Sequence, residues 1–364
     1  MTLFADILAM AALALTAPSD GAVVPTLSDI QKGYLAKDRV ARFATMTNGV
    51  ERRRIARGGP FPPPLRLAWE GAPRAECEVE FDYGGRKQVF SVTNVSEIYV
   101  TNLELGGKYR WTVRSGGESA SASFSTESVP PRLLRIAGVA NVRDCGGWKG
   151  LDGKRVKQNM ILRSSGLRSS SRKIGKSLFS SRYEAGDANV TPEGIAVLRD
   201  EFHVRTDIEL RGSQETVCMQ DSVLGRDVRW VKTPLAAYDF IGDMMRGREP
   251  FAALFQEFLD EGNYPILFHC SGGRDRTGTL AFLLNGLLGV SEDDLCRDWE
   301  ASVFSEGNLE FGSSRIERLL AYIGSVGGDN ITERCENFAR SCGITDAEIA
   351  KFRQIMLESG EGGS

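Results

Sequence analysis

Two patterns of apolar and polar positions divide the chain. Between residues 21 and 128, short segments alternate apolar with polar side chains and are bounded by Gly, Pro, Ser and Asn, as in residues 65–69, 77–81 and 109–113. Alternation with a period of two puts one face of a strand into a core. We therefore predict an all-β sandwich over residues 21–128.

After a Pro-Pro pair at 130–131 the pattern changes to buried strands separated by amphipathic helices. Residues 206–210 have the pattern of a buried strand, and residues 345–348 form a capping box before the last helix. This alternation predicts an α/β domain over residues 132–359, with a central sheet flanked by helices. A frayed Gly/Ser-rich tail follows at residues 360–364.

The first 20 residues form an apolar leader that is rich in Ala and Leu. Asp6 lies within it, and no Lys or Arg precedes the apolar run. The segment is either a signal peptide without its positive end or a plain N-terminal helix, and we favour export to an extracytoplasmic compartment over a cytoplasmic location. Because no other window reaches the ~18 consecutive apolar residues of a membrane helix, we expect no membrane span.

Charge and rare residues narrow the function classes. Lys and Arg number 45 against 48 Asp and Glu, a net charge of −3, so no global positive field exists to hold nucleic acid, and we predict no such partner. There is no Cys-x-x-Cys pair, and only two histidines occur, His203 and His269. This composition argues against a zinc ribbon or a His-rich metal centre, and we predict neither metal nor cofactor.

One segment, residues 266–279, has the pattern of a buried strand, a tight loop and an apolar helix. Cys270 ends the strand, and Arg276 opens the helix. Gly272 and Gly273 allow the loop to turn its backbone N–H groups inward, which makes an anion cup at a helix N-terminus. The inward amides, the helix and the Arg276 guanidinium favour the thiolate of Cys270, so this side chain is predicted to be a nucleophile.

The chemistry expected of this loop is phosphoryl transfer. The planar guanidinium of Arg276 can bind two phosphoryl oxygens at once, and Asp275 is the nearest group to protonate the leaving oxygen and later to activate water. Thr277 is expected to donate a hydrogen bond to the Cys270 sulfur. We assign phosphate binding to the remaining loop positions: Ser271, Gly272, Gly273, Arg274 and Thr277.

The loop sequence His-Cys-Ser-Gly-Gly-Arg-Asp-Arg-Thr-Gly at 269–278 resembles the protein tyrosine phosphatase superfamily, and within it the bacterial tyrosine/lipid phosphatases. Four further segments extend the resemblance: Asn-Val-Arg-Asp-Cys-Gly-Gly at 141–147, Arg-Ser-Ser-Gly-Leu at 163–167, Asp-Ile-Glu-Leu-Arg at 207–211 with Glu215, and Arg-Asp-Trp-Glu at 297–300. The resemblance implies that Asp275 is the general acid and that hydrolysis passes through a cysteinyl phosphate. Arg274 stands where the family has a lysine associated with phosphoinositides, a departure that changes reach and geometry.

Several supporting residues have two interpretations. Asp144 and Asp207 could supply a second acid or orient Arg276, although a structural role is favoured, and Arg211 is included by its place in the matching segment. His269 is expected to shape the cup by hydrogen bonding, with general-base catalysis as the alternative. Cys145 is either a resolving thiol for Cys270 or a small buried apolar residue.

Segments away from the loop are also open to two interpretations. The basic, Ser-rich residues 168–182 form either a lid that attracts phosphorylated substrates or a solvated loop. Met244, Met245 and Phe251 either line the site entrance or belong to the core.

The N-terminal region has its own resemblance. Residues 103–113, which include Tyr109, are similar to the tyrosine corner of fibronectin type III and immunoglobulin-like modules. Trp69 is similar to their early core tryptophan, although Leu105 stands where that family usually has proline. The resemblance implies an immunoglobulin-like or fibronectin-like sandwich. The region is either a spacer or a reader of a protein or glycan ligand.

The predicted activity is metal-independent hydrolysis of phosphate monoesters. Phosphotyrosine proteins are the first substrate choice, because a deep cup behind an apolar rim would suit a long aryl phosphate. Phosphoinositides, dual-specificity substrates and other small phosphoesters are the alternative. A non-catalytic phosphate-binding or adhesion module is the competing function of another class.

Overall fold

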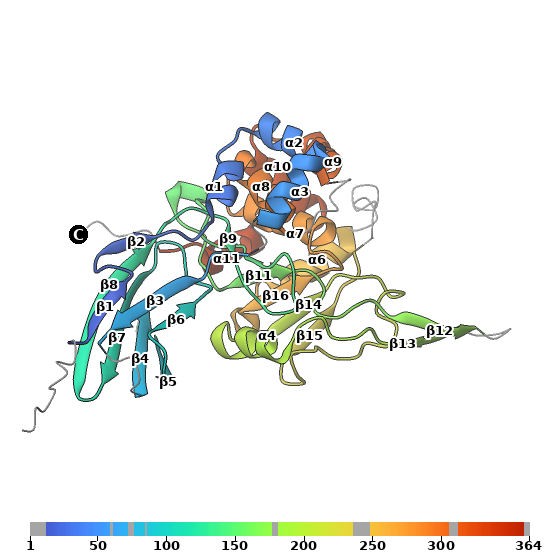
Figure 1. Cartoon of the computed structure of the whole chain (residues 1–364). Helices are drawn as coiled ribbons and strands as arrows, with labels where there is room; N and C mark the ends of the chain where they lie inside the picture. The colour runs from blue at the N-terminus through green and yellow to red at the C-terminus, as the bar shows by residue number, and fades with distance from the viewer. Residues whose placement is uncertain are drawn as a thin grey trace, which may run out of the picture. The chain divides into compact units, whose positions relative to one another are not determined.

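The computed structural model of the protein describes residues 12–58, 61–71, 76–83, 86–176, 181–235, 248–305 and 312–359. The contacts divide the chain into two compact units, so the chain passes between them three times. One unit comprises Met1–Leu27 and Pro62–Val129, and the other comprises Ser28–Phe61 and Pro130–Ser364. Figure 1 shows the elements of both.

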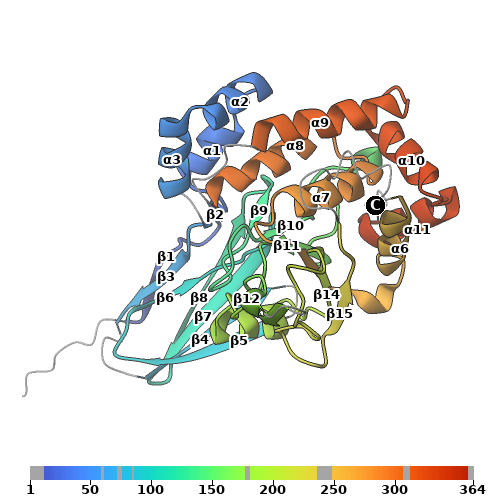
Figure 2. The same ribbon diagram turned by 90° about the vertical axis from the view of Figure 1, so that its right-hand side faces the viewer.

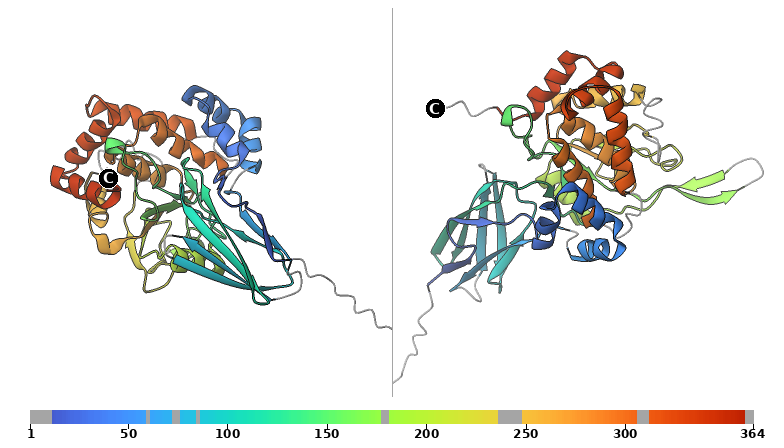
Figure 3. Two further views of the ribbon diagram at one scale, coloured as in Figure 1. Left: turned by 90° about the vertical axis from the view of Figure 1, so that its left-hand side faces the viewer. Right: turned by 90° about the horizontal axis from the view of Figure 1, so that it is seen from above.

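The first unit consists of two β-sheets that enclose one core (Figure 3). A three-stranded sheet has the order β1-β3-β6, and a five-stranded sheet has the order β2-β8-β7-β4-β5. Trp69 from the first sheet and Trp111 from the second are both buried in the shared core. The strands are β1 (Ala14–Ala17), β2 (Ala22–Val24), β3 (Leu65–Glu70), β4 (Glu76–Tyr83), β5 (Arg86–Thr93), β6 (Glu97–Val100), β7 (Lys108–Ser115) and β8 (Glu118–Thr126).

The all-β prediction for residues 21–128 is wrong between residues 29 and 58. Three helices lie there, and they belong to the second unit: α1 (Asp29–Leu35), α2 (Arg39–Thr47) and α3 (Gly49–Gly58). Their starts follow helix chemistry, since Ser28 forms a capping box with Gln31 and the Asp38 carboxylate caps α2. The polar residues of this segment, such as Ser28 and Asp38, cap helices instead of bounding strands.

The predicted leader also overlaps ordered structure. Ala14–Ala17 form β1, which pairs antiparallel with β3. This part of residues 1–20 is therefore a strand of the first unit, whereas residues 1–11 lie outside the described part of the chain.

The second unit is built on a six-stranded sheet with the order β15-β14-β16-β11-β10-β9. The four strands from β15 to β11 are parallel, and β10 and β9 continue the sheet with antiparallel pairings. The strands are β9 (Arg132–Leu133), β10 (Arg143–Asp144), β11 (Ile161–Ser164), β14 (Thr206–Glu209), β15 (Arg229–Lys232) and β16 (Ile266–His269). A parallel sheet followed by helices confirms the α/β prediction for this region.

Both faces of this sheet are covered. Ile266 and Phe268 of β16 pack into one apolar cluster with helix α7, whereas Leu267 between them packs into a second cluster with Leu198 and Phe202. The alternation of side chains along β16 therefore produces three layers. The helices around the sheet, visible in Figure 2, are α4 (Pro192–Ala196), α6 (Arg248–Glu257), α7 (Asp275–Leu287), α8 (Glu292–Glu300), α9 (Gly312–Ser325), α10 (Ile331–Ser341) and α11 (Asp346–Met356).

Two smaller features complete the second unit. Strands β12 (Arg172–Lys176) and β13 (Ser181–Glu184) form an antiparallel ribbon, and a 3-10 turn at Ala301–Phe304 follows α8. Phe251 is a core residue, packed against Phe255 and Phe338; Met244 and Met245 lie outside the described residues. No helix in the described ranges is long and apolar enough to cross a membrane.

Candidate active site

The cysteine loop lies where three parallel strands end together. β16 pairs with β11 on one side and with β14 on the other, so His269 is level with Ser164 and with Glu209. The segments that follow these strands therefore meet at one edge of the sheet. Cys270 comes directly after β16 and is buried, and α7 begins five residues later at Asp275.

Two glycines give the loop its shape for different reasons. Gly273 has a φ of +64°, and a Cβ there would lie 2.5 Å from the carbonyl carbon of Ser164, so no other residue fits without displacement. A Cβ on Gly272 would have no heavy atom within 4 Å, which shows that this residue borders open space.

Donors outside the loop hold its carbonyl groups. The Asn141 side-chain amide donates to the carbonyl oxygens of Gly273 at 2.9 Å and Gly272 at 3.2 Å. Arg163 Nη2 donates to the Gly273 carbonyl as well, at 2.9 Å. Because a trans peptide points its N–H away from its C=O, the N–H groups of Gly273 and Arg274 face the opposite side. Asn141 begins the segment 141–147 that resembles the family, but the sequence did not predict that its side chain binds the loop carbonyls.

Arg276 is held by a carboxylate that the sequence did not single out for this role. Its Nη1 and Nη2 donate to the two oxygens of Glu215 at 2.6 and 3.1 Å, and Nη2 also lies 3.3 Å from Ser271 Oγ. Burial opposes the charge on Glu215, but the bonds from Arg276, Ser271 and the Gly212 N–H lower its pKa to about 2. Burial likewise disfavours the charge on Arg276, yet Glu215 and the nearby Cys270 sulfur raise its pKa.

Asp275 is the first residue of α7, and two arginines contact it. Its carboxylate forms an ion pair with Arg315 of α9 and lies 3.3 Å from Arg274 Nη2. Thr277 is fully buried, and within the described residues its hydroxyl has no hydrogen-bond partner. The predicted bond from Thr277 to the Cys270 sulfur is therefore wrong for this structure.

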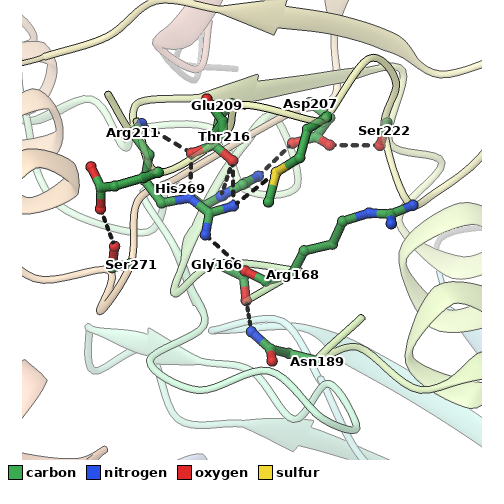
Figure 4. A network of polar contacts seen from close by, with 12 residues as sticks. Gly166, Arg168, Asn189, Asp207, Glu209, Arg211, Thr216, Ser222, His269 and Ser271 are labelled. Atoms are coloured by element: carbon green, nitrogen blue, oxygen red, sulfur yellow. Dashed lines mark hydrogen bonds and ion pairs between the residues drawn. The ribbon is translucent and has the colours of Figure 1, made fainter. Parts of the chain in front are cut away.

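His269 joins two carboxylates of β14 in the network of Figure 4. Its Nε2 lies 2.9 Å from Asp207 Oδ1, and its Nδ1 lies 3.8 Å from Glu209 Oε2. Glu209 is paired with Arg211 at 2.7 Å, and Asp207 accepts a bond from Ser222 at 2.6 Å. Burial opposes a charge on the His269 ring, but Glu209 and Asp207 raise its pKa above the usual value.

Asp144 and Asp207, two candidates for orienting Arg276, form hydrogen bonds with other groups. Asp207 contacts His269, as above, and Asp144 on β10 accepts bonds from Arg132 and from the Gly146 and Asn159 N–H groups, at 2.7–2.8 Å. These contacts agree with the structural role favoured for both aspartates, and Glu215 is the carboxylate that orients Arg276. Cys145 is a buried free thiol whose pKa burial raises.

A cavity of about 610 Å³ opens beside the loop. The predicted apolar rim is missing from its described lining, which is made of small, hydroxyl and amide residues with one arginine. The lining consists of Gly138, Ala140, Asn141, Ser165, Asn189, Ser271, Gly272, Arg274, Ser302 and Ser305.

The basic segment at residues 168–182 is organised as the ribbon β12–β13. Arg172 is paired with Glu184 across the ribbon, at 2.8 Å. At the ribbon's base, the Ser171 N–H donates to the carbonyl of Glu215 at 2.8 Å, which ties the segment to the residue that holds Arg276.

Among the described ranges, no group of three or more His, Cys, Asp and Glu side chains is arranged to hold a metal ion.

One family model and one relative show that this chain is similar to tyrosine phosphatases. The family model described as "Tyrosine phosphatase family" matches residues 134–183 and 185–358, more than half of the chain. A Cupriavidus necator protein named "Putative tyrosine-protein phosphatase" is 30% identical over 227 residues, which is 58% of this chain and 78% of that protein. A shorter match, 28% identical over 107 residues, covers 29% of this chain and 13% of a glycerol-3-phosphate acyltransferase of Hamiltonella defensa.

Among solved structures, the core catalytic domain of a PP-IP phosphatase from S. cerevisiae, in complex with citrate, is 15% identical. The match covers 44% of this chain and 80% of that domain, with a TM-score of 0.29.

Proposed function

This chain belongs to the tyrosine phosphatase family and is a cysteine-based phosphatase, and we propose that Cys270, Asp275 and Arg276 carry out its reaction. The observation that supports this assignment best is the preorganised loop. Cys270 and Arg276 lie in one loop whose Gly272 and Gly273 carbonyls are bound by Asn141 and Arg163. The N–H groups of Gly273 and Arg274 therefore face away from these donors and are available to bind phosphoryl oxygens.

In the first step, the Cys270 thiolate attacks phosphorus and the bond to the leaving oxygen breaks. Asp275 donates a proton to that oxygen, while Arg276 and the loop N–H groups bind the three remaining oxygens. In the second step, water attacks phosphorus, Asp275 takes the water proton, and Cys270 leaves as thiolate. Inorganic phosphate is released, and Arg276 with the loop amides supplies the positive charge that a metal would otherwise provide.

For the substrate, we propose phosphotyrosine proteins, in line with the name of the Cupriavidus relative. The polar cavity lining favours a second candidate, a polyhydroxylated phosphoester such as an inositol phosphate headgroup. Asn189 and the cavity serines can exchange hydrogen bonds with hydroxyl groups, and Arg274 offers a charge for a second phosphate.

The test is turnover of an aryl phosphate, a phosphotyrosine peptide and a phosphoinositide. Cys270→Ser should abolish all three activities, whereas Cys218→Ser, at an exposed cysteine, should leave them unchanged. Asp275→Asn should slow hydrolysis of the phosphoinositide, an alkyl ester, more than hydrolysis of the aryl phosphate. The leaving alkoxide needs a proton more than a leaving phenolate does. Full activity of Cys270→Ser would refute the mechanism, and a preference for the phosphoinositide would select the second candidate.

For the first unit, we propose a fibronectin type III-like sandwich that is either a spacer or a reader of a protein or glycan ligand. The Tyr109 hydroxyl accepts a bond from the Glu104 N–H at 2.7 Å, as in a tyrosine corner. Tyr109→Phe should lower the free energy of unfolding by about 1 kcal/mol, and an unchanged stability would contradict the comparison.

A further inference from the structure

The carboxylate of Asp275 is held from outside the cysteine loop by an arginine of α9. Arg315 lies in the first turn of that helix and forms an ion pair with Asp275. Both side chains are mostly buried, with Arg315 16% exposed and Asp275 21% exposed. A partly buried ion pair is screened less by water and salt than a surface pair, so this contact can fix the direction of the carboxylate.

Arg315 is itself fixed in place by the packing of α9. Ile316, Leu319 and Ile323 follow one another at intervals of three and four residues, and all three are buried. They belong to the same apolar cluster as three leucines of α7, the helix that begins at Asp275: Leu280, Leu283 and Leu284. Arg315 therefore reaches the carboxylate from a rigid support.

Arg274 is the other arginine at this carboxylate, and its surroundings differ. Its Nη2 lies 3.3 Å from Asp275, but Arg274 also lines the cavity beside the loop. A phosphorylated substrate in that cavity would attract the Arg274 guanidinium. Arg315 is then the partner that keeps Asp275 oriented during the reaction.

We propose that Arg315 is a positioning residue, which aims the carboxyl group of Asp275 at the leaving oxygen. The inference rests on the proposed function, in which Asp275 is the general acid. As the P–O bond breaks, the proton moves from Asp275 to the leaving oxygen, and Asp275 becomes a carboxylate beside Arg315. The positive charge of Arg315 stabilises this carboxylate, which then accepts a proton from the attacking water.

The experiment compares two aryl phosphates of similar shape, 4-nitrophenyl phosphate and phenyl phosphate. Phenolate is a poorer leaving group than 4-nitrophenolate, so its departure depends more on the general acid. Arg315→Met removes the charge and keeps a long side chain. It should lower kcat/KM about 10- to 100-fold for phenyl phosphate and less than about 3-fold for 4-nitrophenyl phosphate. Because both substrates are assayed on one sample, the ratio of the two values does not depend on the fraction of folded enzyme.

Arg318→Met is the matched control, since Arg318 is exposed on the same helix, and its ratio should equal that of the wild type. In an Asp275→Asn background, Arg315→Met should not change the ratio further, because the group that Arg315 positions is already gone.

Two results would overturn this inference while the general-acid assignment stands. One is an Arg315→Met ratio equal to that of the wild type when Asp275→Asn alters the ratio, and the other is a further change of the ratio in the double variant. A wild-type ratio in Asp275→Asn would instead refute the general-acid assignment, and the inference would fall with it.

Discussion

The contact between Glu215 and Arg276 allows a sharp test of how the site is preorganised. Glu215→Gln preserves the length of the side chain and its acceptor for Ser271, but it removes the charge and one of the two oxygens that Arg276 binds at 2.6 and 3.1 Å. We expect the guanidinium to lose its fixed position beside Cys270. Phosphoryl oxygens would then bind a mobile guanidinium instead of one held in a fixed orientation.

The magnitude follows from the ionisation of Glu215. A pKa lowered from 4.5 to about 2 corresponds to an upper bound of about 3 kcal/mol for its favourable contacts. The side chain is 28% exposed, so solvent screens the pair, and we expect about 1–2 kcal/mol. If Arg276 uses this positioning energy in the transition state, kcat/KM should fall roughly 5- to 30-fold.

The assay is steady-state turnover of an aryl phosphate together with inhibition by inorganic phosphate. Glu215→Gln should lower kcat/KM and weaken phosphate inhibition. Glu184→Gln, the same exchange in the exposed pair with Arg172, should change neither. Tighter phosphate inhibition in Glu215→Gln would refute the reasoning, because it would mean that Glu215 competes with phosphate for Arg276.

Three further predictions concern the loop, its neighbour and the N-terminal helices. Gly273→Ala should lower activity at least ~100-fold through its 2.5 Å clash, whereas Gly272→Ala, with free space, should cost far less. His269→Gln should destabilise the protein below pH 6.5. The raised pKa of His269 means that this loss shrinks as the pH rises through the folded value, as urea unfolding against pH would show. Arg42→Met should lower the free energy of unfolding by about 3–5 kcal/mol in urea titrations, since Glu300 stays buried without its partner.

The cysteine loop could be predicted because its chemistry is local. A buried strand, Cys270, two glycines, Arg276 and an apolar helix follow one another within 19 residues. Each of these positions has a physical requirement that a sequence displays directly.

The residues that complete the site could not be predicted in the same way. Asn141 and Glu215 reach the loop from segments far away in the sequence, and their contacts exist because β16 lies between β11 and β14. No local pattern states which strands are neighbours. Glu215 lies a few positions after the buried strand at 206–210, but Asp207 and Glu209 within that strand are equally plausible from the sequence, and in the structure Asp207 binds His269.

The helices α1–α3 could not be assigned to the second unit from the sequence, because no local pattern states which distant segment a helix packs against. They are part of the unit that holds the cysteine loop. They precede the region that matches the family, yet Arg42 of α2 is fully buried and forms an ion pair with Glu300 at the end of α8. The 3-10 turn that follows Glu300 carries Ser302, whose hydroxyl lies 3.2 Å from the Asn141 amide nitrogen. That same nitrogen donates to the Gly273 carbonyl. Buried polar contacts and the short stretch of backbone from Glu300 to Ser302 therefore connect α2 with the cysteine loop, so a segment outside the family match supports this loop.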